Sequence, residues 1–212
     1  MNFKFTNKKV VLILVLILLL FIGGVFLWRT REEPFKEWRS QYSPKEDYVV
    51  IETPDGKILK NEKMGLKVGI PDGWKLDERW EGGLVGNIIL TSQDFERQPG
   101  NNPFKKGCLI EIGIADYGKY ETVETETIKD FIEMCKAEPE QLKKDGYEYV
   151  KIDEYEALKT TTPNKPETER FISVRVLIDN KVYSFSTPLY SENKERCAQE
   201  FDEFLETVSI NR

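Results

Sequence analysis

Histidine is absent from this chain of 212 residues, and cysteine occurs only three times. Without an imidazole, the chain lacks the usual general base near neutral pH, the common nitrogen ligand of zinc and the ordinary pH switch of proteins. Catalysis by a Ser-His-Asp triad or a Cys-His pair is therefore excluded. The sequence also lacks the glycine-rich motifs that bind phosphate in P-loop and dinucleotide-binding proteins.

The chain also has no excess of positively charged residues. The chain has 31 Lys and Arg residues against 37 Asp and Glu residues, a formal charge of −6, and 40% of it is hydrophobic, as is typical of a globular protein. The basic residues are dispersed among carboxylates, whereas binding to a phosphate backbone needs a basic face. We therefore expect no nucleic-acid partner.

The longest apolar run, Val10–Trp28, contains no charged residue. At a rise of about 1.5 Å per residue, a helix of this length crosses most of a bilayer core of about 30 Å, so the run predicts a transmembrane helix in contact with membrane lipid. A cleaved signal peptide is the competing interpretation, but the run ends without a small-x-small cleavage site, and no cysteine follows it to take a lipid. We expect Trp28 and Arg29 at the membrane interface.

The segments on either side of this span indicate its orientation. Residues 1–9 form a short basic leader, and a large domain follows the span. This order favours a signal anchor that crosses the plasma membrane once and leaves the C-terminal domain on the extracytoplasmic side. Residues 29–47 are charged and interrupted by proline, so they predict a tether. A short amphipathic helix is an equal alternative, because Phe35, Trp38 and Tyr42 have helical spacing.

Residues 48–212 are enough for one domain with a single core. Alternating apolar residues and turn residues predict its strands. They are a hairpin over 48–60, strands over 66–70, 87–92 and 108–115, one long strand over 147–162, and a second hairpin formed by 171–178 and 181–187. A loop is predicted between 92 and 108, and Trp74, which follows a Pro-Asp-Gly turn, is predicted to lie in the core.

Helical spacing of apolar residues predicts two helices in this domain. The first spans Thr127–Lys144, with Thr127 and Asp130 as an N-cap pair and with Pro139 kinking or dividing it. The second begins at Ser191 and has an apolar stripe that we expect to pack on the sheet.

Four segments occur in an order that resembles PsbP-like domains: GIPDGW at 69–74, IKDFIEMC at 128–135, RFISVRVLIDNKVYSFS at 170–186 and FDEFLETVSI at 201–210. The resemblance implies an α+β fold in which helices pack on both sides of an antiparallel sheet, an α/β/α sandwich, here behind an N-terminal transmembrane helix. The family includes extrinsic photosystem II subunits and membrane-tethered bacterial relatives of unknown role. The resemblance implies a fold more than a function, and without histidine no histidine-containing metal site is implied.

The three cysteines, Cys108, Cys135 and Cys197, are candidates for a disulfide. An extracytoplasmic domain favours one disulfide among them, with the pairing open and one thiol left over. The alternative that we prefer is three small buried apolar side chains, because Cys135 and Cys197 each lie on the apolar face of a predicted helix. A zinc site made of cysteines alone would need a fourth ligand and closer spacing.

Two aromatic residues are candidates for a partner surface. Trp80 lies between charged residues and glycines in a predicted loop, and Phe104 lies in the loop before residue 108. We expect this surface to bind a protein or an envelope polymer. The acidic clusters, such as residues 153–156, are typical of solvated faces and lack the spacing of a calcium loop, so we predict no metal and no cofactor.

The sequence therefore favours a single-pass membrane protein that presents a binding or assembly module outside the cytoplasm, without a recognisable catalytic constellation. Two alternatives stay open, namely a His-free hydrolase of envelope polymers that uses carboxylates, and a sensor that binds metal through carboxylates. An enzyme would need a concave site with a perturbed pair of carboxyl groups. An adaptor would need an exposed apolar patch.

Overall fold

The computed structural model describes residues 41–77, 87–96, 106–118, 122–162, 170–189 and 193–211, all of which belong to one compact unit beginning at Gln41. The predicted leader, span and interface residues Trp28 and Arg29 lie outside the described residues, as do Trp80 and Phe104. Within the described ranges, no helix is both long and apolar enough to cross a membrane. Residues 41–47, which the sequence analysis assigned to the tether, belong to the folded unit.

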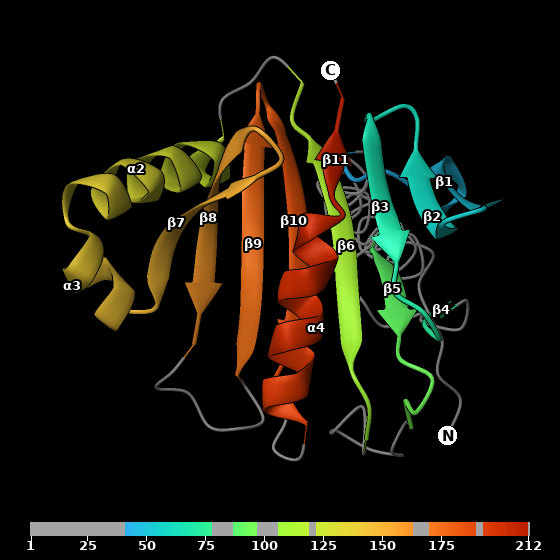
Figure 1. Ribbon diagram of the computed structural model, residues 1–212. Helices are drawn as coiled ribbons and strands as arrows, with labels where there is room; N and C mark the ends of the chain where they lie inside the picture. The colour runs from blue at the N-terminus through green and yellow to red at the C-terminus, as the bar shows by residue number, and fades with distance from the viewer. Residues whose placement is uncertain are drawn as a thin grey trace, which may run out of the picture. The chain divides into compact units, whose positions relative to one another are not determined.

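Antiparallel strands are the main regular structure of the described chain (Figure 1). The strands are β1 (Tyr48–Thr53), β2 (Gly56–Asn61), β3 (Leu66–Ile70), β4 (Lys75–Leu76), β5 (Ile88–Thr91), β6 (Leu109–Asp116), β7 (Tyr147–Ile152), β8 (Tyr155–Thr161), β9 (Phe171–Ile178), β10 (Lys181–Pro188) and β11 (Ser209–Ile210). The helices are the 3-10 turn η1 (Lys45–Asp47) and α2 (Val123–Ala137), α3 (Pro139–Lys144) and α4 (Lys194–Glu206).

The smaller sheet has the strand order β1-β2-β3-β11. Its first two strands are the predicted hairpin, with Thr53 opposite Gly56 across the turn. Gly56 has a φ of +122°, a backbone conformation that residues other than glycine rarely adopt. This explains why the Pro-Asp-Gly turn has glycine at this position. Strand β11 has only two residues, too few for an alternation pattern, and was not predicted.

The larger sheet has the strand order β4-β5-β6-β10-β9-β8-β7. The predicted hairpin of 171–178 and 181–187 is confirmed as β9 and β10. The prediction of one long strand over 147–162 is wrong, because the chain reverses after Ile152 and forms the hairpin β7–β8. Asp153 has a φ of +55°, and aspartate tolerates this left-handed conformation in tight turns, so the reversal needs no glycine or proline.

Helix α2 begins four residues before the predicted start. Its N-cap is Thr122, whose hydroxyl accepts a hydrogen bond from the Thr125 amide while the Thr125 side chain accepts one from the Thr122 amide. This reciprocal pair is a capping box, so the predicted pair Thr127 and Asp130 is wrong. Pro139 divides the predicted helix as expected, because proline fits the first turn of α3 but cannot continue α2.

Helices cover both faces of the larger sheet. On one face, α4 packs with the smaller sheet on a core that includes Phe185, Phe201 and Phe204, and α4 lies across the front of this sheet in Figure 1. On the other face, α2 and α3 pack on a second cluster that includes Leu158 and Val182. Trp74 is buried in the first core, as predicted. The α+β fold of antiparallel sheets is therefore confirmed.

Candidate functional site

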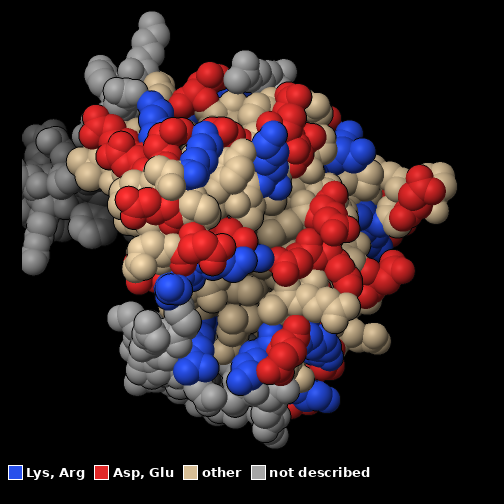
Figure 2. Space-filling model, turned by 60° about the vertical axis from the view of Figure 1, so that its left-hand side comes forward, with Lys and Arg blue, Asp and Glu red and all other residues tan. Residues whose placement is uncertain are grey.

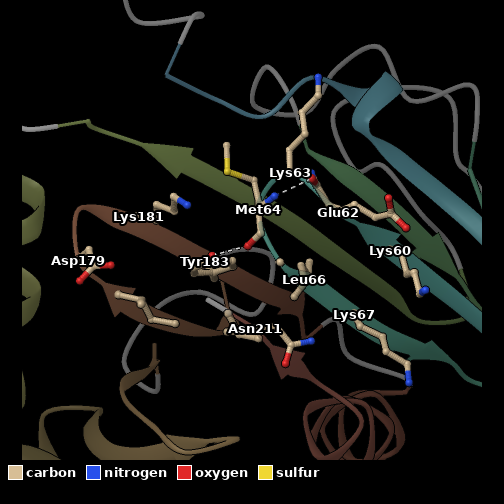
Figure 3. Close-up of a pocket in the computed structure, with 14 residues that line it drawn as sticks. Lys60, Glu62, Lys63, Met64, Leu66, Lys67, Asp179, Lys181, Tyr183 and Asn211 are labelled. Atoms are coloured by element: carbon tan, nitrogen blue, oxygen red, sulfur yellow. Dashed lines mark hydrogen bonds between the residues drawn. The ribbon is translucent and has the colours of Figure 1, made fainter.

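A pocket of about 480 Å³ lies where the β2–β3 turn, the β9–β10 turn and the C-terminal strand β11 meet (Figure 3). Its volume falls within the range of ordinary small-molecule sites. The lining side chains come from segments that are far apart in the sequence: Lys60–Lys67, Ile178, Asp179, Lys181, Tyr183, Ile210 and Asn211.

Buried polar side chains hold the β2–β3 wall of this pocket in shape. Asn61 is fully buried, and its Oδ1 accepts a hydrogen bond of 3.2 Å from the Met64 amide. Its Nδ2 donates a bond of 2.7 Å to the hydroxyl of Ser43, which is also buried. Because a buried amide is costly to leave without partners, Asn61 specifies one conformation of the turn.

Tyr183 ties the two sheets together beneath the pocket. Its hydroxyl donates a hydrogen bond of 2.6 Å to the Met64 carbonyl, and the labelled side chains of Figure 3 show this contact at the centre of the site. Burial, followed by the charges of Asp116, Tyr155 and Asp179, raises the pKa of Tyr183 to about 12. The tyrosine is therefore neutral over the physiological pH range and remains a donor.

The C-terminal strand closes the third wall. The Asn211 amide donates to the Gly65 carbonyl at 2.9 Å, and the Ile210 amide donates to Asp153 Oδ2 at 3.1 Å. Gly65 has a φ of +69°, and a Cβ built on it would lie 1.8 Å from the Asn211 carbonyl oxygen. Only glycine permits this approach of the two backbones, so the wall depends on it.

The rim of the pocket is rich in lysine. Lys60, Lys63, Lys67 and Lys181 line it, against Glu62 and Asp179. Lys63 pairs with Asp47. The other three lysines form no ion pair with any residue in the described part of the chain, although Lys181 lies opposite Asp116 in the register of β10 and β6.

A second hollow of about 400 Å³ lies between α2, α3 and β7, and its lysines form ion pairs. Its Lys136 pairs with Glu133 at 2.9 Å and with Glu156 at 2.7 Å. Its Lys143 pairs with Glu148 at 3.3 Å. Both lysines of this hollow are therefore paired, whereas Glu140 in its lining forms no ion pair within the described ranges, and acidic and basic side chains are interspersed over the face in Figure 2. The lysine-rimmed pocket is the better candidate for a charged ligand.

The side chains with polar groups that line the lysine-rimmed pocket are lysines, carboxylates, amides and a tyrosine. None of the described residues that line it is a serine, threonine or cysteine, and the chain has no histidine. The side chains that are present can donate hydrogen bonds, neutralise a charge and contact an apolar group. In the described ranges, no group of three or more Cys, Asp or Glu side chains is arranged to hold a metal ion.

The structure distinguishes the three cysteines. Cys108, before β6, forms a disulfide with Cys197 on α4, whereas Cys135 is unpaired and buried on α2. The interpretation that we preferred, in which all three cysteines are unpaired and buried, therefore holds for Cys135 alone. The sequence alone could not show which cysteines pair. Cys108 and Cys197 are 89 positions apart and meet only because α4 packs on the larger sheet.

Charged residues surround this disulfide. Arg196, beside Cys197, donates to Asp94 Oδ2 at 3.0 Å and to Asp94 Oδ1 at 3.1 Å. These bonds hold the pKa of Asp94 below its usual value, and they favour its charged form. The Ser92 hydroxyl donates to the same carboxylate and accepts from the Cys108 amide, so the cluster fixes the loop around the disulfide and has a structural explanation.

The sequence analysis did not identify the lysine-rimmed pocket. A partial signal was present, because the predicted hairpin and the following strand place Lys60 beside Lys67 once the register is known. The contribution of Tyr183 and Asn211 depends on the meeting of two sheets, which no local pattern encodes. Of the predicted partner surface, Trp80 and Phe104 lie outside the described residues.

Comparisons with known proteins concern the fold. No family model and no curated protein sequence matches the chain. The chain is similar to a crystal structure of a protein from Bacteroides thetaiotaomicron, with a TM-score of 0.38 and 16% identity over 70% of this chain, and it spans 46% of that protein, less than half its length. It is also similar to the solution structure of cyanobacterial PsbP (CyanoP) from Synechocystis, with a TM-score of 0.41 and 10% identity over 78% of this chain and 93% of the other. This second likeness is to the PsbP-like fold that the sequence resembles.

Proposed function

We propose that the folded domain is a ligand-binding module, held at the outer surface of the plasma membrane by the apolar segment 10–28, and that the lysine-rimmed pocket is its binding site. The pocket is the observation that carries the proposal. It combines a volume suited to a small organic molecule with polar groups at the rim and apolar groups at the floor.

The fixed walls of the pocket support binding. The contacts of Asn61, Tyr183 and Asn211 hold the β2–β3 turn, β10 and the end of β11 in one arrangement through hydrogen bonds within the protein itself. A site that is formed beforehand does not spend binding free energy on ordering its own side chains and loops.

The disulfide supports the extracytoplasmic location. Disulfides persist in oxidising compartments and are rare where thiols are kept reduced. The bond between Cys108 and Cys197 therefore fits a domain outside the cytoplasm.

Photo-crosslinking in intact cells tests the proposal. Benzoylphenylalanine is placed in the full chain at position Glu62, on the pocket rim, or at Glu195 on α4, whose side chain is 83% exposed and remote from the pocket lining. We expect an adduct of defined mass at position 62 and none at position 195. Absence of any adduct at position 62, or identical adducts at both positions, would refute binding at this pocket.

Cysteine alkylation in the same cells tests the extracytoplasmic location of the domain. The chain is denatured in a thiol-alkylating reagent, with or without prior reduction, and its mass is measured. We expect one alkylated cysteine before reduction and three after it, because only Cys135 is free. Three alkylated cysteines without reduction would contradict an oxidising compartment.

A further inference from the structure

We infer that the outer face of the smaller sheet docks on the lipid bilayer that carries the anchor, through β1, β2 and the adjoining part of β3. Three aliphatic side chains, Val49, Ile51 and Ile58, enter the region between the headgroups and the acyl chains. Lys60 and Lys67 contact anionic headgroups. The inference goes beyond the proposed ligand site and rests only on the membrane anchor that the proposed function includes.

The strand register defines which side chains share the outer face. Side chains directly opposite one another on neighbouring antiparallel strands lie on the same face of the sheet. Val49, Lys60 and Lys67 form one row across β1, β2 and β3, and Ile51 and Ile58 form the next row. The residues that alternate with them belong mainly to the core between the smaller sheet and the larger one. These five side chains therefore point away from the larger sheet.

Three of the five form an aliphatic patch. Val49 is 56% exposed, and Ile51 and Ile58, which lie opposite one another, are partly exposed. Single exposed apolar side chains are common on soluble proteins, whereas adjacent ones with polar neighbours are typical of protein or membrane interaction sites. Strand β1 is at the edge of its sheet, so the patch reaches the margin of the domain.

The charges on this face are all positive. Lys60 and Lys67 lie beside the patch and form no ion pair within the described ranges. Glu52, the only acidic residue in the four strands, belongs to the other face and pairs with Lys57 at 3.6 Å. Anionic headgroups attract lysine, whose aliphatic stem packs on apolar groups while its ammonium group stays in water. This combination fits an anionic lipid surface.

Helix α4 limits the contact to the smaller sheet. The helix packs on the same face of the larger sheet as the smaller sheet does, so the two elements expose the same side of the domain (Figure 1). Glu203 and Glu206 of α4 are exposed. Their charge is repelled by anionic headgroups. The domain should therefore tilt so that β1 and β2, rather than α4, approach the bilayer.

The chain between the anchor and the folded unit favours the bilayer as the partner. Residues 29–40 lie between the apolar segment 10–28 and Gln41, where the folded unit begins. At about 3.5 Å per residue they reach about 40 Å when fully extended, close to the diameter of a domain of this size. The bilayer is thus always within reach, at a high effective concentration, and a weak attraction is sufficient for docking.

Quenching by labelled lipid tests the contact. A fluorescent nitrobenzoxadiazole group is attached to Val49→Cys in the full chain, with Cys135→Ala removing the free thiol. Val123→Cys is the matched control, because Val123 is 81% exposed on α2, which packs on the opposite face of the larger sheet. Each nanodisc holds one chain and a nitroxide-labelled lipid, in phosphatidylcholine with or without phosphatidylglycerol.

We expect lipid to quench the probe at position 49 and not the probe at position 123. Phosphatidylglycerol should raise the ratio of docked to undocked domains at least about fivefold, the effect of one lysine near an anionic surface. Added salt should reduce this increase, since it screens the charges. Equal quenching at the two positions, or none at position 49, would overturn the inference. Because each nanodisc holds one chain, a second copy cannot cause the quenching.

Matched charge variants test the two lysines. The double variant Lys60→Gln/Lys67→Gln should lose the increase that phosphatidylglycerol causes at position 49. Lys136→Gln/Lys143→Gln is the control, because it removes the same charge from the hollow beside α2 and α3. The control should keep the increase. Equal losses in the two double variants would show a general effect of net charge and would overturn the assignment of the lysines.

The same preparation separates this inference from the anchor on which it rests. A chain that does not remain with the nanodiscs during gel filtration would contradict the anchor formed by residues 10–28, and with it both the proposed location and the docking. A chain that remains with the nanodiscs but is not quenched at position 49 would overturn the docking alone.

Discussion

Removal of the Cys108–Cys197 disulfide should destabilise the domain strongly. The bond closes a loop of 89 residues, and the loss of loop-closure entropy in the unfolded chain is worth about 4.5 kcal/mol for that length. Both cysteines are buried, so the double variant Cys108→Ala/Cys197→Ala also removes packed sulfur atoms. With a urea dependence of about 2 kcal/mol per molar, typical of a small domain, the unfolding midpoint should fall by about 2 M.

The assay follows the fluorescence of Trp74, which is buried and becomes exposed on unfolding, in a chain whose other tryptophans are replaced by phenylalanine. Cys135→Ala is the matched control, because Cys135 is equally buried but unpaired, and its replacement should cost only about 1 kcal/mol. A double variant whose midpoint lies within about 0.5 M of this control would refute the loop-closure argument.

Two further predictions concern the pocket walls. Gly65→Ala forces a Cβ to within 1.8 Å of the Asn211 carbonyl oxygen at a φ of +69°, so it should lower the free energy of unfolding by about 2 kcal/mol and shift the carbon-13 NMR signal of the Met64 methyl group. Tyr183 has a pKa raised from 10 to about 12 in the folded state, so its contribution to stability is complete below pH 10 and is lost as the pH rises toward 12. Unfolding midpoints measured across this window should therefore fall less steeply in Tyr183→Phe than in the parent chain, and equal slopes would contradict this origin of the pH dependence.

The elements that the sequence predicted correctly are those whose signals are local. Alternation and a turn with its own chemistry defined β1–β2 and β9–β10. The β7–β8 reversal was missed because Asp153 and Glu154 have no glycine or proline beside them, and aspartate supplies the required positive φ. The start of α2 was missed because a Thr-Thr capping box lacks the usual acidic residue at its third position.

The candidate site was less predictable than the fold, for a physical reason. Lys60 and Lys67 are neighbours only through register, and Lys181 and Asn211 join them only because two sheets and the C-terminus meet. Charged residues on a strand are ordinarily solvated, so their spacing alone does not distinguish a site from a surface. Which of them meet at one place depends on how the two sheets pack, and that is a tertiary property.

The disulfide and the pocket wall are anchored at opposite ends of α4, so the stability of the domain and the shape of the pocket depend on different contacts. Cys197 fastens the start of this helix to the beginning of β6. At the other end, the Thr207 hydroxyl accepts a hydrogen bond of 3.0 Å from the Gly69 amide, and the chain then pairs with β3 as β11. The pocket wall is thus anchored by contacts at the far end of the helix from the disulfide. Because these contacts do not involve sulfur, reduction should lower the population of folded molecules while the pocket of those that remain folded keeps its geometry.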